Sequence, residues 1–347
     1  MATVVRGSAI GLLVTALALV IAVAPFQTAA AYKSSDKPAV EYRFSGPYTH
    51  GNLTIFFVHG KDRIKDRGIL TLEEALRRKQ VIVRETKNVN RLVIWNGSAN
   101  EVLLQAGDIL RGGQQDRTIA FDTIVPPRSG WRALAVFCVE AHRWAKRGQE
   151  AEGYFMPSIN SLAHNTLKIA ARKKGGNQSA VWENVAKTQK TLKEKLQTEV
   201  RAEQSQSSLE LTLANNKVVE AVNACLEDLQ DVPEKQKDAI GCAAVINGKV
   251  NNADVYASSN LFHKLWAKLL KASAVEALAE KNDKKFEAVK ADAVRVFFAD
   301  AEKGEKSETK IDRRFRQTER ENAKSILFET SDGARKGVIL RRSYVAK

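Results

Sequence analysis

Short apolar runs separated by turn residues make up the first part of the chain after residue 50. These runs are rich in β-branched and aromatic side chains, which is typical of strands. The predicted strands are residues 53–58, 81–83, 92–95, 102–104, 118–121 and 134–139. Their close succession favours antiparallel packing, in a sandwich or a partly closed barrel.

One short helix is predicted between these strands. Thr71-Leu72-Glu73-Glu74 has the spacing of a capping box, in which a threonine and a glutamate three positions later bond to each other's backbone N–H groups. The helix is expected to continue through residue 79. Pro126-Pro127 and Ser129-Gly130 break the chain between the last two predicted strands.

From about Met156 the pattern changes to longer polar helices. Apolar residues recur at helical spacing, as in a helix with one buried face. The predicted helices are residues 160–174, 181–203, 217–229 and 261–270. A strand at 240–246 is expected to run into an Asn247-Gly248 turn.

The last part of the chain is predicted to close the fold. Strands are expected at 294–298, 325–328 and 338–340, with a charged loop over 302–320. The fold class predicted from these patterns is α+β, with a β-rich antiparallel sandwich or partly closed barrel and a helical second half. Its predicted parts are a β-rich core at 32–155, a helix-rich part of the same domain at 156–290, and closing strands with a charged segment at 291–347.

Residues 1–31 differ from the rest of the chain. Arg6 precedes an apolar run over residues 10–24, and Ala29-Ala30-Ala31 stands before Tyr32. A positive start, an apolar centre and small residues at the exit are typical of a secretory signal peptide. We therefore expect a protein exported to the periplasm or the extracellular space after cleavage, with an uncleaved N-terminal anchor as the alternative. No later segment reads as a membrane span.

The chain is basic, with a formal net charge of +15. Residues 1–31 contain one arginine and no acid, so the mature chain carries +14. Basic residues are concentrated in 166–201 and 281–347. Such surfaces attract phosphorylated ligands or acidic polymers, but here the basic residues alternate with acids and lack an aromatic stacking pattern. The sequence contains no specific nucleic-acid motif.

Three cysteines are too few for a disulfide scaffold. Cys138 lies in an apolar strand and is expected to act as a small buried side chain. One bridge, joining Cys242 to Cys225 or to Cys138, stays open. No histidine pattern indicates a metal site, and no cofactor is predicted.

The strongest candidate for a site is the segment Gly112-Gly113-Gln114-Gln115-Asp116-Arg117, which follows an apolar run. Adjacent glycines allow backbone conformations that other residues avoid, and an amide, a carboxylate and a guanidinium group follow within about one turn. Two interpretations stay open: a ligand site, or a loop held by its own hydrogen bonds.

This segment also carries a resemblance to a known family. Gly107-Asp108-Ile109-Leu110, the 112–117 segment, Phe137-Cys138-Val139-Glu140 and Arg143-Trp144 resemble the domain family named for its association with ADP-ribosylglycohydrolases and rhodanese/phosphatase-superfamily proteins. The resemblance continues through residues 178–182, 241–248 and 253–259, so it covers most of 45–290. It implies a domain of unknown biochemical function, with a link to ADP-ribose, nucleotide or phosphate chemistry.

Arginine and carboxylate side chains define the predicted ligand site. Arg117 and Arg143 can each grip a phosphate with two hydrogen bonds, and Asp116 or Glu140 can orient them or accept a sugar hydroxyl. Trp144 can stack on a base. The predicted ligand-binding residues are Gly112, Gly113, Gln115, Asp116, Arg117, Glu140, Arg143 and Trp144. In the alternative interpretation, Glu140 and Arg143 form a salt bridge that ties the loop to its strand.

Catalysis is the second hypothesis. Asp108, Asp116, Glu140 and His142 are the candidate acids and bases for hydrolysis of a glycosidic or phosphate bond. The sequence lacks the Gly-x-Ser-x-Gly elbow of a serine hydrolase. A third hypothesis is a basic protein that contacts acidic polymers. The preferred prediction is an exported domain that binds an anionic or ribose-containing ligand, ADP-ribose or nucleotide-like, through the 112–117 loop; whether it is an enzyme stays open.

Overall fold

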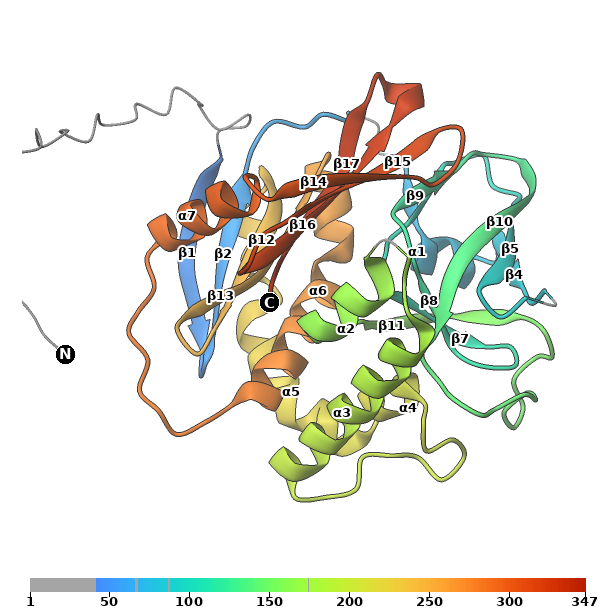
Figure 1. The fold of residues 1–347 in the computed structure, drawn as a ribbon, viewed down its shortest axis with the longest axis horizontal. Helices are drawn as coiled ribbons and strands as arrows, with labels where there is room; N and C mark the ends of the chain where they lie inside the picture. The colour runs from blue at the N-terminus through green and yellow to red at the C-terminus, as the bar shows by residue number, and fades with distance from the viewer. Residues whose placement is uncertain (1–41, 66–67, 87, 174) are drawn as a thin grey trace, which may run out of the picture. The chain divides into compact units, whose positions relative to one another are not determined.

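The largest element of the fold is an antiparallel sheet of eight strands, in the order β1-β2-β12-β13-β17-β16-β15-β14 (Figure 1). The computed structural model describes residues 42–65, 68–86, 88–173 and 175–347. The signal peptide predicted at 1–31 lies outside the described residues. The strands are β1 Arg43–His50, β2 Leu53–His59, β12 Ala239–Ile246, β13 Lys249–Tyr256, β14 Glu305–Lys310, β15 Phe315–Glu321, β16 Ser325–Asp332 and β17 Val338–Ala346.

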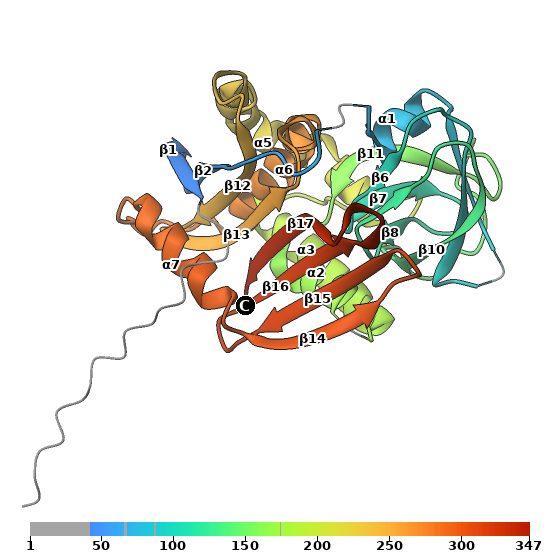
Figure 2. The same cartoon turned by 90° about the horizontal axis from the view of Figure 1, so that it is seen from above.

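A second, smaller sheet has the order β11-β7-β8-β10-β5-β4, and β3, β6 and β9 form a third. In the six-stranded sheet, the edge strand β4 forms a bridge from Arg84 to Tyr154, which directly precedes the other edge strand, β11. This sheet therefore curves back toward itself. Figure 2 shows these strands grouped on one side of the eight-stranded sheet. The strands are β3 Leu70–Thr71, β4 Val81–Arg84, β5 Arg91–Asn96, β6 Val102–Leu104, β7 Asp108–Gly112, β8 Arg117–Ile119, β9 Thr123–Val125, β10 Ser129–Cys138 and β11 Phe155–Ser161.

Helices cover both faces of the eight-stranded sheet. In β2, Ile55 and Phe57 belong to the core shared with α5 and α6, whereas Phe56 and Val58 pack in the core shared with α7. Side chains alternate between faces along a strand, so α6 and α7 lie on opposite sides of the sheet. The helices are α1 Leu72–Arg77, α2 Asn165–Arg172, α3 Gln178–Leu196, α4 Leu209–Leu213, α5 Asn216–Leu229, α6 Ser259–Glu280 and α7 Ala291–Ala301, with single 3-10 turns at Val232–Lys235 and Gly333–Arg335.

The α+β class is confirmed, and so are most local predictions. Thr71 caps α1, and the reciprocal bonds of the capping box are both present. The strand at Ala239–Ile246 runs into the predicted turn, where Asn247 and Gly248 both have positive φ. The predicted helix at 160–174 begins too early, because residues through Ser161 pair with β7 and α2 starts at Asn165. The helix predicted at 181–203 ends at Leu196.

Two predictions near the C-terminus are wrong. Residues 294–298 form part of helix α7 instead of a strand, because Val294, Phe298 and Ala301 recur on one helical face and are buried against the sheet. The charged stretch 302–320 is ordered as the β14–β15 hairpin instead of a loop. Its charged side chains alternate with Gln317 and Glu319, which are buried at 0% and 3% exposure.

The three cysteines are buried and unpaired in the structure. Cys138 lies in β10, as expected for a small core side chain. No helix in the described part of the chain is long and apolar enough to cross a membrane.

Candidate functional site

The predicted loop joins β7 to β8, and its two glycines are required by the backbone. Gly112 and Gly113 have φ of 119° and 54°. A Cβ on Gly112 would lie 2.8 Å from the carbonyl oxygen of Tyr154 on the neighbouring segment. Only glycine combines this conformation with so close an approach. The loop therefore folds tightly over the edge of β11.

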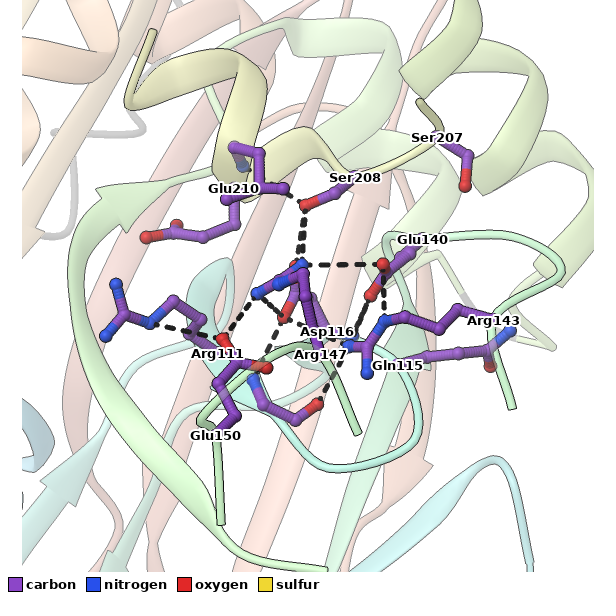
Figure 3. Close-up of polar contacts among 12 residues, drawn as sticks. Arg111, Gln115, Asp116, Glu140, Arg143, Arg147, Glu150, Ser207, Ser208 and Glu210 are labelled. Carbon is purple, nitrogen blue, oxygen red and sulfur yellow. Dashed lines mark hydrogen bonds and ion pairs between the residues drawn. The ribbon is translucent and has the colours of Figure 1, made fainter. Parts of the chain in front are cut away.

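The polar side chains of this loop point inward. Gln115, Asp116 and Arg117 are all 0% exposed, as is Glu140 two residues after β10. Asp116 accepts hydrogen bonds from the backbone N–H of Gly112 at 2.9 Å and from the hydroxyl of Ser208 at 2.7 Å (Figure 3). The carboxylate is thus bound from its own loop and from the start of α4.

Two arginines complete an ion cluster around Asp116 and Glu140, as Figure 3 shows. Arg147 binds Asp116 through Nη1 at 3.0 Å and Nη2 at 3.1 Å. Arg143 binds Glu140 through Nε at 2.6 Å and Nη2 at 2.7 Å, and it donates to the carbonyl oxygen of Gly113 at 2.8 Å. The Glu140–Arg143 salt bridge offered as the alternative interpretation is therefore present, and it ties the loop to β10.

Burial and neighbouring charges set the protonation of this ion cluster. Burial, together with the charge of Glu140, raises the pKa of Asp116. Burial opposes ionisation of Glu140 too, but hydrogen bonds from Arg143 and from the backbone N–H of Asp116 hold its pKa below the usual value. The pKa of Arg147 is raised by Asp116 and Glu150 despite burial. The two carboxylates share the positive charge of two arginines.

Other predicted site residues lie apart from this ion cluster. Arg117 donates to the carbonyl oxygen of Gln115 at 2.6 Å and lies 3.4 Å from Glu85. Trp144 is 58% exposed. Among the candidate acids and bases, only Asp116 and Glu140 come together.

The remaining two candidates have other surroundings. Asp108 lies 3.4 Å from the ammonium group of Lys268, and burial raises its pKa. His142 lies beside the ring of Trp182, with a centroid distance of 6.2 Å. Sequence reasoning missed Arg147, which sits in an irregular segment with no periodicity to mark it as buried.

A large cavity lies elsewhere, among the start of α2, the middle of α3, the β12–β13 turn and the end of α6. Its volume is about 740 Å³. It is lined by side chains that lie far apart in the sequence, and sequence reasoning did not find it. The basic residues that line it are Lys187, Lys249, Lys284, Lys285 and Lys347, with His164 at the start of α2.

Two carboxylates, Glu276 and Glu280, also line the cavity, so the lining is positive on balance. Lys347 pairs with Glu321. The four other lysines are exposed, and within the described residues none of them has a carboxylate within ion-pair distance. Clustered cations without partners favour binding of an anion.

Acceptor groups gather at another part of the cavity lining. The Glu276 carboxylate is 1% exposed and accepts from the backbone N–H of Asn165 at 2.9 Å. Asn165 is 8% exposed, and its Oδ1 has no hydrogen-bond partner in the structure. The Nε2 atom of His164 also lacks a partner, and burial lowers the pKa of this ring to about 4.

Comparison with known proteins gives one match. Residues 41–344 match the family model described as the ARG and Rhodanese-Phosphatase-superfamily-associated Protein domain. No curated protein and no solved structure matches the chain. Within the described residues, no group of three or more histidine, cysteine or acidic side chains could hold a metal ion.

Proposed function

Since this chain belongs to the family of ARG and Rhodanese-Phosphatase-superfamily-associated Protein domains, we propose that it binds a phosphate-bearing ligand of nucleotide size, with ADP-ribose as the first candidate. The family's biochemical function is unknown, and its name associates it with proteins of ADP-ribose and phosphate chemistry. We propose further that the mature domain acts outside the cytoplasm, on the basis of the signal-like residues 1–31.

The single observation that carries the proposal is the cavity of about 740 Å³ lined by four exposed lysines that form no ion pair within the described residues. Small-molecule pockets are commonly about 300–1,000 Å³, which includes the size of a nucleotide. Lysine ammonium groups bind phosphate as point charges and need no fixed geometry. We therefore place the ligand in this cavity, with Lys187, Lys249, Lys284 and Lys285 around its phosphates.

The sequence alone favoured the 112–117 loop as the ligand site. We move the proposed site because the groups there already bind one another. Asp116, Glu140 and Arg143 have short internal partners, and Arg117 is 0% exposed. A ligand would have to displace these charge-assisted bonds, which are among the stronger polar contacts in proteins. We assign this ion cluster the role of holding the 141–150 segment against the six-stranded sheet.

The same ion pairs argue against the hydrolase alternative at these residues. A general acid or base must reach its substrate within hydrogen-bond distance. Asp116 and Glu140 do not line the cavity, and arginines hold both carboxylates. Binding is therefore the function that we prefer.

The test is calorimetric titration of ADP-ribose into the purified protein. The Lys187→Glu/Lys285→Glu variant should bind at least about tenfold more weakly, since each lost charge-assisted contact costs roughly 1.5–3 kcal/mol. Lys190→Glu/Lys303→Glu is the matched control: it changes the net charge equally, and neither lysine lines the cavity. Equal loss in both variants would point to bulk charge instead of a site.

Salt separates this proposal from the polymer-binding alternative. Binding of a polyanion through scattered lysines falls steeply as ionic strength rises. The basic helical surface is partly compensated, because Lys173 pairs with Glu321 and Lys195 donates to the carbonyl oxygen of Lys281. If only polyanions bind, with a steep salt dependence that the control variant shares, the polymer interpretation replaces ours.

A further inference from the structure

The cavity presents two kinds of chemistry to a ligand. Lysines supply positive charge from α3, from the start of β13 and from the segment after α6. Glu276 on α6 and Asn165 at the start of α2 supply acceptor oxygens. The phosphate dianion of a monoester has only acceptor oxygens, so it fits the lysines and would be repelled by the carboxylate. The ligand must therefore carry a second kind of group.

The hydrogen bonds of Glu276 show that its carboxylate can accept further hydrogen bonds. The contact from the backbone N–H of Asn165 is of ordinary length at 2.9 Å. The contacts from Asn251 Nδ2, Asn252 Nδ2 and Lys168 Nζ are 3.5, 3.4 and 3.6 Å long. A carboxylate offers about four lone-pair sites, and contacts this long are weak or are not hydrogen bonds.

Asn165 provides a second acceptor that is fixed in place. Its Nδ2 donates to the carbonyl oxygens of Asn251 at 2.9 Å and Ala346 at 3.2 Å. Its Oδ1 has no partner, although the residue is 8% exposed. A buried acceptor without a partner costs free energy, which a ligand donor would recover.

We infer that the cavity selects a phosphorylated sugar, with the phosphate on the lysines and neighbouring sugar hydroxyls donating to Glu276 and Asn165 Oδ1. This inference rests on the proposed function and specifies the ligand class within it. Neighbouring sugar hydroxyls supply several donors, so they satisfy both acceptors at once, which the phosphate group of a monoester cannot do. Ribose 5-phosphate is a small probe that carries both parts.

The test compares three probes by calorimetric titration: ribose 5-phosphate, 2-deoxyribose 5-phosphate and inorganic phosphate. The wild-type protein should bind ribose 5-phosphate at least about tenfold more tightly than inorganic phosphate, with the deoxy sugar in between. This comparison needs no substitution, so it does not depend on the folding of a variant. Equal binding of all three probes would overturn the inference.

The Glu276→Gln variant is the second test, because it should affect the two probes in opposite directions. The substitution should weaken the binding of ribose 5-phosphate by about 10- to 100-fold, because a charged acceptor is lost. The affinity for inorganic phosphate should stay the same or rise, because the substitution removes a negative charge from the cavity. Glu183→Gln on α3, exposed and not part of the lining, is the control.

The outcomes also separate the two proposals. If Glu276→Gln strengthens the binding of both ribose 5-phosphate and inorganic phosphate, the carboxylate only repels phosphate. The inference of a sugar ligand then fails, while the proposed anion site stands. If neither these probes nor ADP-ribose binds the wild-type protein, the proposed function itself fails.

Discussion

Arg147 and Asp116 form a two-pronged ion pair, with Nη1–Oδ2 at 3.0 Å and Nη2–Oδ1 at 3.1 Å. The pair joins an irregular segment after β10 to the turn between β7 and β8. The guanidinium group also lies 3.4 Å from Glu140 and 2.8 Å from Glu150. Arg147 therefore neutralises more than one acid while its own side chain is only 6% exposed.

Removing this guanidinium group should destabilise the fold strongly. Arg147→Met leaves Asp116 and Glu140 buried with Arg143 as their remaining cation, and breaking such a pair costs about 3–5 kcal/mol. The measurement is the free energy of unfolding from denaturant titration. Lys146→Met, at the exposed neighbouring position, is the control and should change little. A loss for Arg147→Met below about 1 kcal/mol would show that the ion cluster is not structural.

Arg117→Ala should separate stability from binding. Its side chain is 1% exposed and lies near Glu85, so its loss should lower the free energy of unfolding by about 3 kcal/mol. The dissociation constant for ADP-ribose should stay within about twofold of the wild-type value, because the cavity is lined by other segments. Titration at a temperature where the variant remains folded measures both. Binding lost by a folded variant would return the ligand to the 112–117 loop.

Acid should destabilise the protein through His164. Burial lowers the pKa of its ring from 6.5 to about 4, so the unfolded chain takes up this proton at a higher pH than the folded chain does. The contribution of neutral His164 to the free energy of unfolding is therefore constant above about pH 6.5 and is lost as the pH falls from 6.5 to 4. The loss amounts to about 3 kcal/mol at most. Unfolding free energies of wild type and His164→Gln, measured across this range, should show a shallower slope for the variant. Parallel slopes would contradict the prediction.

The thiols should be unreactive until the protein unfolds. All three cysteines are buried and unpaired, and burial raises the pKa of Cys225 to about 11. Thiolate is the reactive form, so a thiol reagent should label the native protein slowly and label all three sites in denaturant. The thermal midpoint should not change with reductant. Fewer than three reactive thiols in denaturant without reductant would instead indicate one of the bridges considered from the sequence.

Local sequence patterns predicted those parts of the fold that local interactions determine. The Thr71–Glu74 capping box and the Asn247-Gly248 turn each depend on neighbouring residues and were predicted correctly. The apolar run at 294–298 fits a strand or a helix equally well, and its packing against the sheet decides for α7. The β14–β15 hairpin is too charged to be recognised as strands, because its partner strand β16 supplies the burial.

In the candidate site, too, local sequence patterns predicted one part, whereas the rest depends on contacts between distant segments. The 112–117 segment was identified from its glycines and its dense polar groups, and the residues do converge. Their convergence as mutually bound ions depends on Arg147 and Ser208, which no local pattern links to the loop. The cavity depends on residues from 164 to 347, and only the folded chain brings them together.

The strand order has a consequence for how the chain assembles. In the described sheet, β17 is the link between a half made of β1, β2, β12 and β13 and a half made of β14 to β16. Each half contains hairpins that pair locally. The seam between β13 and β17, from Asn252–Val345 to Tyr256–Arg341, joins segments distant in sequence, as does the pairing of β2 with β12. Long-range pairings are slow to form, so the seam should close late. Pulsed amide exchange during refolding should therefore protect the amides that pair β15 with β16 before those that pair β13 with β17.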